Sequence, residues 1–220
     1  MAIQVQTETI ERRQLSIWLA IAGLGCAGAL TGLIAQYLRQ DNGADGALMT
    51  LGGGMAIWVA IGFLLARRTA GARPARDRIA WVSVTAAAYL FAWLIAYHAL
   101  LGAREHLGFA QVWPQMRYWL VAVAPACLAL GFIATESLRK DVLGDICLAL
   151  PLGWSLPEIY SNARLGGAHI AVVSIPTLLV ASLPLLALRR RWWSLPVVVV
   201  TVLVIGVPFH LLFPQFSLDS

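Results

Sequence analysis

The chain has 220 residues, of which 60% are hydrophobic and only 12% are charged, and its mean hydropathy is +0.75. Soluble globular domains carry nearer one quarter charged residues, so this composition excludes an ordinary water-soluble domain and indicates an integral membrane protein. The net charge of +5 does not indicate a nucleic-acid partner, because the basic residues form short clusters beside apolar segments, where anionic lipid headgroups attract each of them by about 1 kcal/mol.

Seven apolar segments follow one another along the chain, which predicts an all-α, polytopic transmembrane helical bundle. A spanning helix needs roughly 20 mainly apolar residues. No stretch between the segments is long enough for a soluble domain, so residues 1–220 are expected to form a single integral membrane domain. The spans are predicted at residues 15–38, 47–66, 79–101, 117–135, 142–157, 169–188 and 193–213.

The first span is longer than the roughly 7 to 15 apolar residues of a signal-peptide core, and Glu8 and Glu11 interrupt the basic region that precedes such a core. We expect it to be retained, with cleavage as the alternative. Gly25, Gly28 and Gly32 form one face of this span, and small residues let helix backbones approach closely in lipid. The face is predicted either to pack on the second span, which is also rich in small residues, or to dock another subunit. Under docking, Gly28→Leu abolishes association without unfolding the chain.

All four histidines fall at the predicted outer ends of spans. His98 ends the third span, His106 lies in the following loop, His169 opens the sixth and His210 closes the seventh. Histidine and carboxylate together can bind a transition metal or shuttle protons, and two facing imidazoles can hold a haem. No pair shows a local ligand signature such as His-Glu-x-x-His, and interfacial histidines with one wet end are the ordinary alternative.

The fifth span, Val142 to Pro157, is the shortest, and Asp145 and Pro151 within it predict a broken, tilted or partly re-entrant passage. If this segment did not cross, the basic triplet 189–191 would move to the outside, so the triplet favours a crossing. Glu136 and Asp145 lie within about one turn of the basic edge. Neutralisation by nearby cations is the favoured interpretation for both carboxylates. The available cations are Arg139, Lys140 and Arg189 to Arg191.

Glu158 is the best single candidate for a contact with a substrate or a cation. Pro157 is expected to end the fifth helix, which places this carboxylate at a helix terminus that faces outside. A surface ion pair with Arg164 is the structural alternative. The predicted substrate-binding set consists of Glu158, His98, His169, His210, Arg117 and Arg164.

Prolines are absent from the first three spans and present in each of the last four. A proline removes a backbone donor and frees a carbonyl, so the helix kinks and the exposed backbone must face protein or a wet cavity. The second half is therefore where a cavity is expected, although prolines are also commoner in membrane helices generally. The residues concerned are Pro125, Pro151, Pro176, Pro184 and Pro208.

The basic residues alternate between the two sides of this pattern. Cytoplasmic loops retain Lys and Arg, so the crowded side is predicted to be cytoplasmic, with the amino terminus inside and the carboxyl terminus outside. The crowded gaps hold twelve of the sixteen: Arg12, Arg13, Arg67, Arg68, Arg73, Arg76, Arg78, Arg139, Lys140, Arg189, Arg190 and Arg191. The alternate gaps hold Arg39, Arg104, Arg117 and Arg164.

Several chemistries have no motif in this chain. Cys26, Cys127 and Cys147 all fall inside predicted spans, which indicates buried thiols rather than a disulfide framework or a zinc site. A phosphate-binding Gly-rich loop, a Gly-x-Ser-x-Gly elbow and a Cys-x-x-Cys pair are also absent from the sequence. No catalytic residue is therefore predicted, and the chain itself is not expected to hydrolyse ATP.

The order of these features resembles a family of multi-spanning actinobacterial membrane proteins defined by a domain of unknown function. The resemblance covers nearly the whole chain through short apolar motifs, and it implies an integral membrane protein with Glu158 as the acid of most interest. The residues that carry it are Gly25, Gly28, Gly32, Trp58, Tyr97, Trp119, Pro125, Glu158 and Tyr160.

The sequence thus favours a small transporter, or the membrane subunit of one, in the inner membrane of a bacterium. A polar, outward-open cavity is expected near Glu158, His98, His169 and His210. The expected partners are the lipid bilayer and either a second membrane subunit or an ATPase module, and no nucleic acid. An outward-facing haem- or metal-binding protein, or a membrane enzyme that uses this metal, is the alternative, and a structural scaffold is a further one.

Overall fold

The computed structural model describes residues 2–39, 47, 50–51, 56–71, 77–188 and 194–212, and within residues 2–17, 39 and 205–212 it describes the helix alone. All regular structure in these ranges is helical, which confirms the all-α class. The principal helices are α1 (Ala2–Arg39), α3 (Ala56–Gly71), α4 (Arg78–Arg104), α5 (Phe109–Glu136), α6 (Val142–Leu165) and α9 (Ser194–Leu212). Between the last two, one passage of mixed geometry runs through α7 (Gly167–His169), η3 (Ile170–Ser174), α8 (Ile175–Ser182) and η4 (Leu183–Ala187).

Within the described ranges, five helical segments are long and apolar enough to cross a membrane, which indicates a membrane protein by length and composition. A sixth, α3, has only 16 residues and includes Arg67 and Arg68 near its end. The second predicted span, 47–66, meets this helix only from residue 56, because residues 48–49 and 52–55 lie outside the described ranges. The five candidate spans are Trp18–Leu38, Arg78–Arg104, Phe109–Glu136, Val142–Leu165 and Gly167–Ala187.

Two helices extend beyond the predicted spans, because helix continues through residues taken as interruptions. The fourth span was predicted from Arg117, but α5 begins at Phe109, where the Gly108 N–H donates to the Gln111 side chain at 2.8 Å and starts the helix. The fifth span was predicted to end at Pro157, yet α6 continues to Leu165. A proline removes one donor without preventing the next turn where neighbouring groups can satisfy the freed backbone.

The passage from α7 to η4 is where proline does change the helix. Residues Ile170–Ser174 form a π-helical turn, in which the Ile175 N–H bonds the Ile170 carbonyl, directly before Pro176. Pro184 then lies in the 3-10 turn η4. By contrast, Pro125 and Pro151 lie within uninterrupted α-helices. Among the described helices, a change of helix type beside a proline is therefore seen in this passage.

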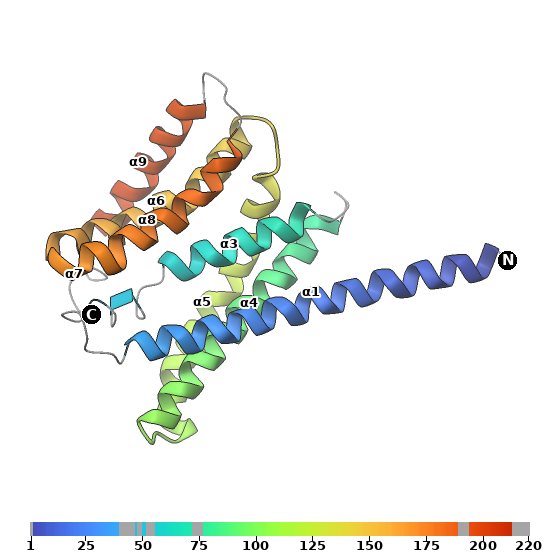
Figure 1. The fold of residues 1–220 in the computed structure, drawn as a ribbon, viewed down its shortest axis with the longest axis horizontal. Helices are drawn as coiled ribbons and strands as arrows, with labels where there is room; N and C mark the ends of the chain where they lie inside the picture. Colours follow the sequence, from blue (N-terminus) through green and yellow to red (C-terminus); the bar gives the residue numbers. More distant parts are fainter. Residues whose placement is uncertain are drawn as a thin grey trace.

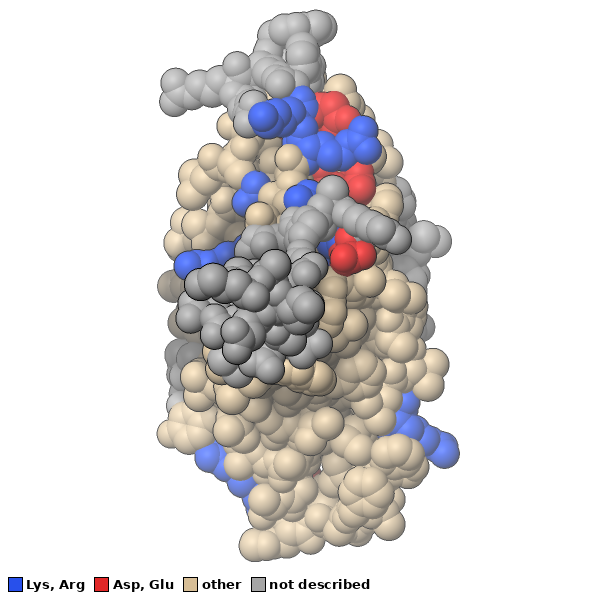
Figure 2. Space-filling view, turned by 90° about the vertical axis from the view of Figure 1, so that its right-hand side faces the viewer, with Lys and Arg blue, Asp and Glu red and all other residues tan. Residues whose placement is uncertain are grey.

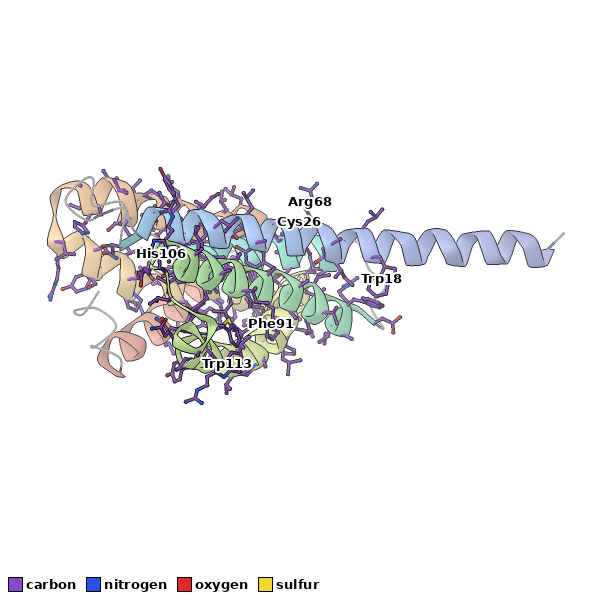
Figure 3. All side chains as sticks on the ribbon, turned by 90° about the horizontal axis from the view of Figure 1, so that it is seen from below. Trp18, Cys26, Arg68, Phe91, His106 and Trp113 are labelled. Atoms are coloured by element: carbon purple, nitrogen blue, oxygen red, sulfur yellow. The ribbon has the colours of Figure 1, made fainter. Side chains whose placement is uncertain are left out.

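Helix α4 is the centre of the first half of the molecule. It contacts α1, α3 and α5, while α3 also contacts α6 and α8 and so joins the first half to α6, α8 and α9 (Figure 1). Helix α1 has 38 residues, about 57 Å at 1.5 Å per residue, against roughly 30 Å for the hydrocarbon core of a bilayer. Beyond Trp18, towards the amino terminus, it continues without a neighbouring helix (Figure 3).

Glycines bring the backbones of α1 and α4 together. A Cβ added at Gly28 would lie 2.1 Å from the Tyr89 carbonyl oxygen, and one at Gly32 would lie 2.2 Å from that of Trp93. Each step of four residues on α1 matches a step of four on α4, so the two helices run parallel. Gly25 is looser, its nearest neighbour being the Ala88 carbonyl oxygen at 4.0 Å. The tight part of the small-residue face thus packs within the chain, and on α4 rather than on the second predicted span.

Tyr89 is the side chain on which α1, α3 and α4 meet. Its hydroxyl lies 3.2 Å from Thr31 Oγ1, which donates to it, and 3.4 Å from the Trp58 carbonyl oxygen, to which it donates. Its ring lies against Gly62, where an added Cβ would come within 3.0 Å. The side chain is 1% exposed, so its hydrogen bonds replace the water that an apolar environment cannot supply.

The substitution Gly28→Ala is expected to destabilise the fold by about 1–3 kcal/mol, because α1 must move away from α4 to make room for the methyl group. Gly23→Ala is the matched control in the same helix, since nothing lies within 4 Å of its added Cβ, and helix propensity makes it neutral or stabilising by up to about 1 kcal/mol. The apparent melting temperature in detergent measures both. Equal melting temperatures for the two variants would contradict the close contact, and the expectation that Gly28→Leu spares folding is revised accordingly.

Candidate functional site

The structure does not gather the six predicted substrate-binding residues into one site. His98 is buried in α4 and its Nδ1 lies 2.9 Å from the Leu94 carbonyl oxygen. It lines a cavity of about 320 Å³ between α4 and α5 whose other lining residues are apolar or glycine. None of the other five predicted residues contributes to that cavity.

Glu158 holds the beginning of a neighbouring helix. Its Oε2 accepts a hydrogen bond of 3.1 Å from the backbone N–H of Ala56, the first residue of α3. A carboxylate is favourable there, because the first N–H groups of a helix lack partners and carry partial positive charge. Glu158 lies inside α6 rather than at its end, so the predicted terminal position is corrected and the observed contact is structural.

The remaining four predicted residues come from four different helices. Arg164 is exposed, stacks on the Tyr160 ring at 4.4 Å and donates to the Tyr160 hydroxyl. Arg117 is exposed on α5, and His169 is partly exposed at the end of α7. His210 belongs to α9, in the part whose side chains fall outside the described residues.

A polar cavity lies at the other end of these helices. Its volume is about 130 Å³ and its walls come from the end of α3, the turn between α5 and α6, the first turns of α6 and the end of η4. In Figure 2 the acidic side chains and most of the basic ones lie in the upper part of the view, and a few basic side chains lie at the lower edges of a largely uncharged surface. The lining residues are Arg67, Ser137, Leu138, Arg139, Lys140, Asp145, Leu148 and Ala187.

Asp145 is the buried carboxylate of this cavity. It is 6% exposed, in the first turn of α6, and its Oδ2 accepts a hydrogen bond of 2.8 Å from the Ser194 hydroxyl at the start of α9. Neutralisation of Glu136 and Asp145 by nearby cations was predicted from the sequence, and it is confirmed for Glu136, which pairs with Arg139 at 3.1 Å. Arg139 pairs otherwise with Asp141, at 2.6 Å, and not with Asp145, and the predicted cations Arg189 to Arg191 lie outside the described residues. An ionisable residue buried in a membrane helix is a functional candidate by default.

Arg67 faces the same cavity from α3. Its Nε is buried and has no hydrogen-bond partner among the described residues. Lys140 adds a second cation from the α5–α6 turn. The cavity is therefore lined by charges of both signs that come from separate helices, an arrangement able to bind a small polar solute.

The turn between α5 and α6 orders the cavity wall. Asp141 Oδ1 accepts from the Gly144 N–H at 3.1 Å and so caps α6, while its Oδ2 accepts from Arg139 Nε at 2.8 Å. The Arg139 guanidinium, and then the Gly144 N–H, hold the pKa of Asp141 below its usual range. Gly144 leaves no space for a side chain, since a Cβ would lie 2.4 Å from the Arg139 carbonyl oxygen.

Comparisons of the chain with protein-family models, with curated proteins and with solved structures give no match. The resemblance to the actinobacterial family stays a prediction. Within the described part of the chain, no three His, Cys, Asp or Glu side chains are grouped so that they could hold a metal ion. The cavity around Asp145 and Arg67 is therefore the candidate site.

Because the pKa of Asp141 is lower in the folded state than in the unfolded chain, its contribution to stability is present above about pH 4 and is lost as the pH falls through the folded-state pKa. Asp141→Asn keeps a capping oxygen but has no charge to lose. The melting temperature of the unaltered chain is expected to fall more steeply than that of Asp141→Asn between about pH 5 and about pH 3. Parallel pH profiles would show that the Arg139 contact contributes nothing.

Proposed function

We propose that the chain is a small membrane transporter, or the membrane subunit of one, and that the cavity around Asp145 binds its solute. The observation that carries this proposal is a polar cavity at the end of the helices whose charged walls come from α3, α6 and the α5–α6 turn. Sites of secondary transporters are commonly built where helices lose regular geometry, because the freed backbone must line a cavity or protein. The irregular passage from η3 to η4 ends at this cavity, through Ala187.

The proposal differs from the sequence-based expectation in the position of the site. That expectation centred on Glu158 and the histidines, but Glu158 bonds the first residue of α3 and His98 lies among apolar residues. At the opposite end, Asp145 and Arg67 line one space without forming an ion pair with any described residue. Unneutralised charges in a cavity support a charged or polar solute better than buried groups that already have partners.

The orientation in the membrane is part of the proposal. Arg67, Arg139 and Lys140 line one cavity, so the end of α3 and the α5–α6 turn lie on the same side, as alternating spans require. Arg67 is followed by Arg68, and Arg78 begins the next helix. This concentration supports a cytoplasmic position for the cavity and for the amino terminus, and an external position for the α4–α5 turn and the carboxyl terminus.

Partners and location follow from the same arrangement. The close-packed glycines of α1 face α4, so a second membrane subunit or an ATPase module would meet another surface. The side of α1 away from these glycines carries Leu19 and Leu30, each more than half exposed at 64% and 59%. Such a face is suited to lipid or to another apolar helix. A bacterial inner membrane is the location that we propose.

Transport can be measured with purified protein in liposomes loaded with a panel of small solutes: inorganic anions, carboxylates, amines and amino acids. Exchange of at least one radiolabelled solute above empty liposomes is expected. Asp145→Asn and Arg67→Gln should each reduce it roughly tenfold or more, the effect of losing one charged contact. Arg68→Gln is the matched control, since this neighbouring arginine is exposed and does not line the cavity. No exchange by the full chain, or equal loss in the control, would contradict the proposal.

The orientation is tested by single cysteines in a chain without Cys26, Cys127 and Cys147. Gly71→Cys marks the end of α3 and Glu105→Cys marks the α4–α5 turn, both exposed positions. A membrane-impermeant maleimide added to intact cells should label Glu105→Cys, and Gly71→Cys only after permeabilisation. The reverse pattern would invert the orientation while leaving the cavity unchanged.

A further inference from the structure

Two opposite charges line the cavity without pairing with each other. The Asp145 carboxylate and the Arg67 guanidinium line the same space, yet neither is within ion-pair distance of an opposite charge among the described residues. Burial of either charge without a partner costs free energy. Since Asp145 is 6% exposed and its hydrogen bond comes from the neutral Ser194 hydroxyl, its negative charge remains to be balanced.

Arg139 does not supply that balance. It donates to Asp141 through Nε and Nη2, at 2.8 and 2.6 Å, and to Glu136 through Nη1 at 3.1 Å. These contacts use both sides of its guanidinium on carboxylates at the edge of the helices. Arg67 lines the cavity, and its buried Nε has no hydrogen-bond partner among the described residues.

The size of the space limits what can enter. The cavity has a volume of about 130 Å³, slightly less than an engineered apolar cavity of about 150 Å³ that holds benzene. The enclosed part of a ligand therefore has about six non-hydrogen atoms. A peptide, a nucleotide or a sugar is too large to be enclosed.

We infer that the cavity binds a small zwitterion, a molecule with one carboxylate and one ammonium group such as a small amino acid. This inference rests on the proposed function and names its substrate class. The ligand carboxylate pairs with Arg67, with Lys140 beside it, and the ammonium group pairs with Asp145. A simple anion would be attracted by Arg67 but repelled by Asp145. A simple cation would be attracted by Asp145 but repelled by Arg67.

The inference is tested by binding to the purified full-length protein, followed as the rise in apparent melting temperature at equal ligand concentration and ionic strength. The three probes are alanine, propionate, which lacks the ammonium group, and ethylamine, which lacks the carboxylate. Alanine is expected to bind roughly tenfold or more tightly than either analogue, since each analogue leaves one charged wall without a partner. This comparison uses the unaltered chain, so it does not depend on how any variant folds.

Two variants assign the walls. In Asp145→Asn, alanine and propionate should bind with equal affinity, because the ammonium group has lost its partner. Propionate should bind this variant more tightly than it binds the unaltered chain, because the repelling charge is gone. Arg67→Gln should lower the affinity for alanine to that for ethylamine, whereas Arg68→Gln should leave all three affinities unchanged. Equal binding of alanine and propionate, or of alanine and ethylamine, would overturn the zwitterion inference, as would the absence of binding by all three.

The outcome is separable from that of the transport experiment. Binding of alanine without exchange in liposomes would support the zwitterion site and contradict transport by this chain alone. Exchange of a different solute that depends on Asp145 and Arg67 would support transport and contradict the zwitterion inference.

Discussion

A bilayer supplies no water to polar groups, and this constraint explains both the ordered core and the proposed site. Several hydroxyl groups inside the helices are satisfied within the protein: Thr31 donates to Tyr89, Ser137 to the Ala134 carbonyl at 2.7 Å and Ser155 to the Pro151 carbonyl at 2.7 Å. The hydroxyls of Ser83, Thr135 and Thr177 are buried without a partner among the described residues. The same rule makes the exceptions informative, because a charge that lines a cavity without an opposite charge is costly unless a ligand or water completes it. Asp145 and Arg67 are such exceptions.

Close backbone contacts join helix α4 to its neighbours. Helix α4 receives α1 on one face through Gly28 and Gly32, and α5 on another through Gly131, where a Cβ would lie 2.0 Å from Ser83 Oγ. Lipid tails compete equally for apolar side chains, so helices in a membrane gain from approaching closely enough for van der Waals and weak polar contacts between backbones. The small residues therefore define which helices are neighbours, and the hydroxyl groups then fix their depth and rotation.

The sequence predicted the helical class, the membrane environment and most of the apolar segments, since these depend on local composition and length. It failed where an outcome depends on distant partners. Pro157 was expected to end a helix, but α6 continues because proline forbids only one hydrogen bond. Glu158 looked like a ligand at an open helix end, whereas its partner is the Ala56 N–H, 102 residues away. Nothing in the local pattern distinguishes a carboxylate that holds another helix from one that binds a solute.

The contacts of the candidate site could not be predicted from the local sequence either. The sequence analysis predicted that nearby cations, Arg139 among them, neutralise the Asp145 carboxylate. Arg139 instead pairs with Glu136 and Asp141, while the hydrogen bond to Asp145 comes from Ser194, 49 residues away. The usable signal was the concentration of charge at this edge, with three acids and two cations between Glu136 and Asp145. Only the packing of α3 and α6 shows that Arg67 and Asp145 line the same cavity without pairing with each other.

The position of the cavity at the end of the helices also bears on how a transporter could use it. A charge near the membrane edge costs less to bury than one at the centre, so the position of Asp145 and Arg67 at the end of the helices lowers the cost of holding them in the cavity. The passage that borders the cavity contains a π-helical turn beside Pro176 and ends in the 3-10 turn η4, which supplies Ala187 to the wall. Irregular turns exchange hydrogen-bond partners at lower cost than a regular helix, because fewer optimal bonds must be broken. Among these irregular turns η4 is the one that contributes to the cavity wall, through Ala187, whereas η3 lies at the start of the passage, at its other end.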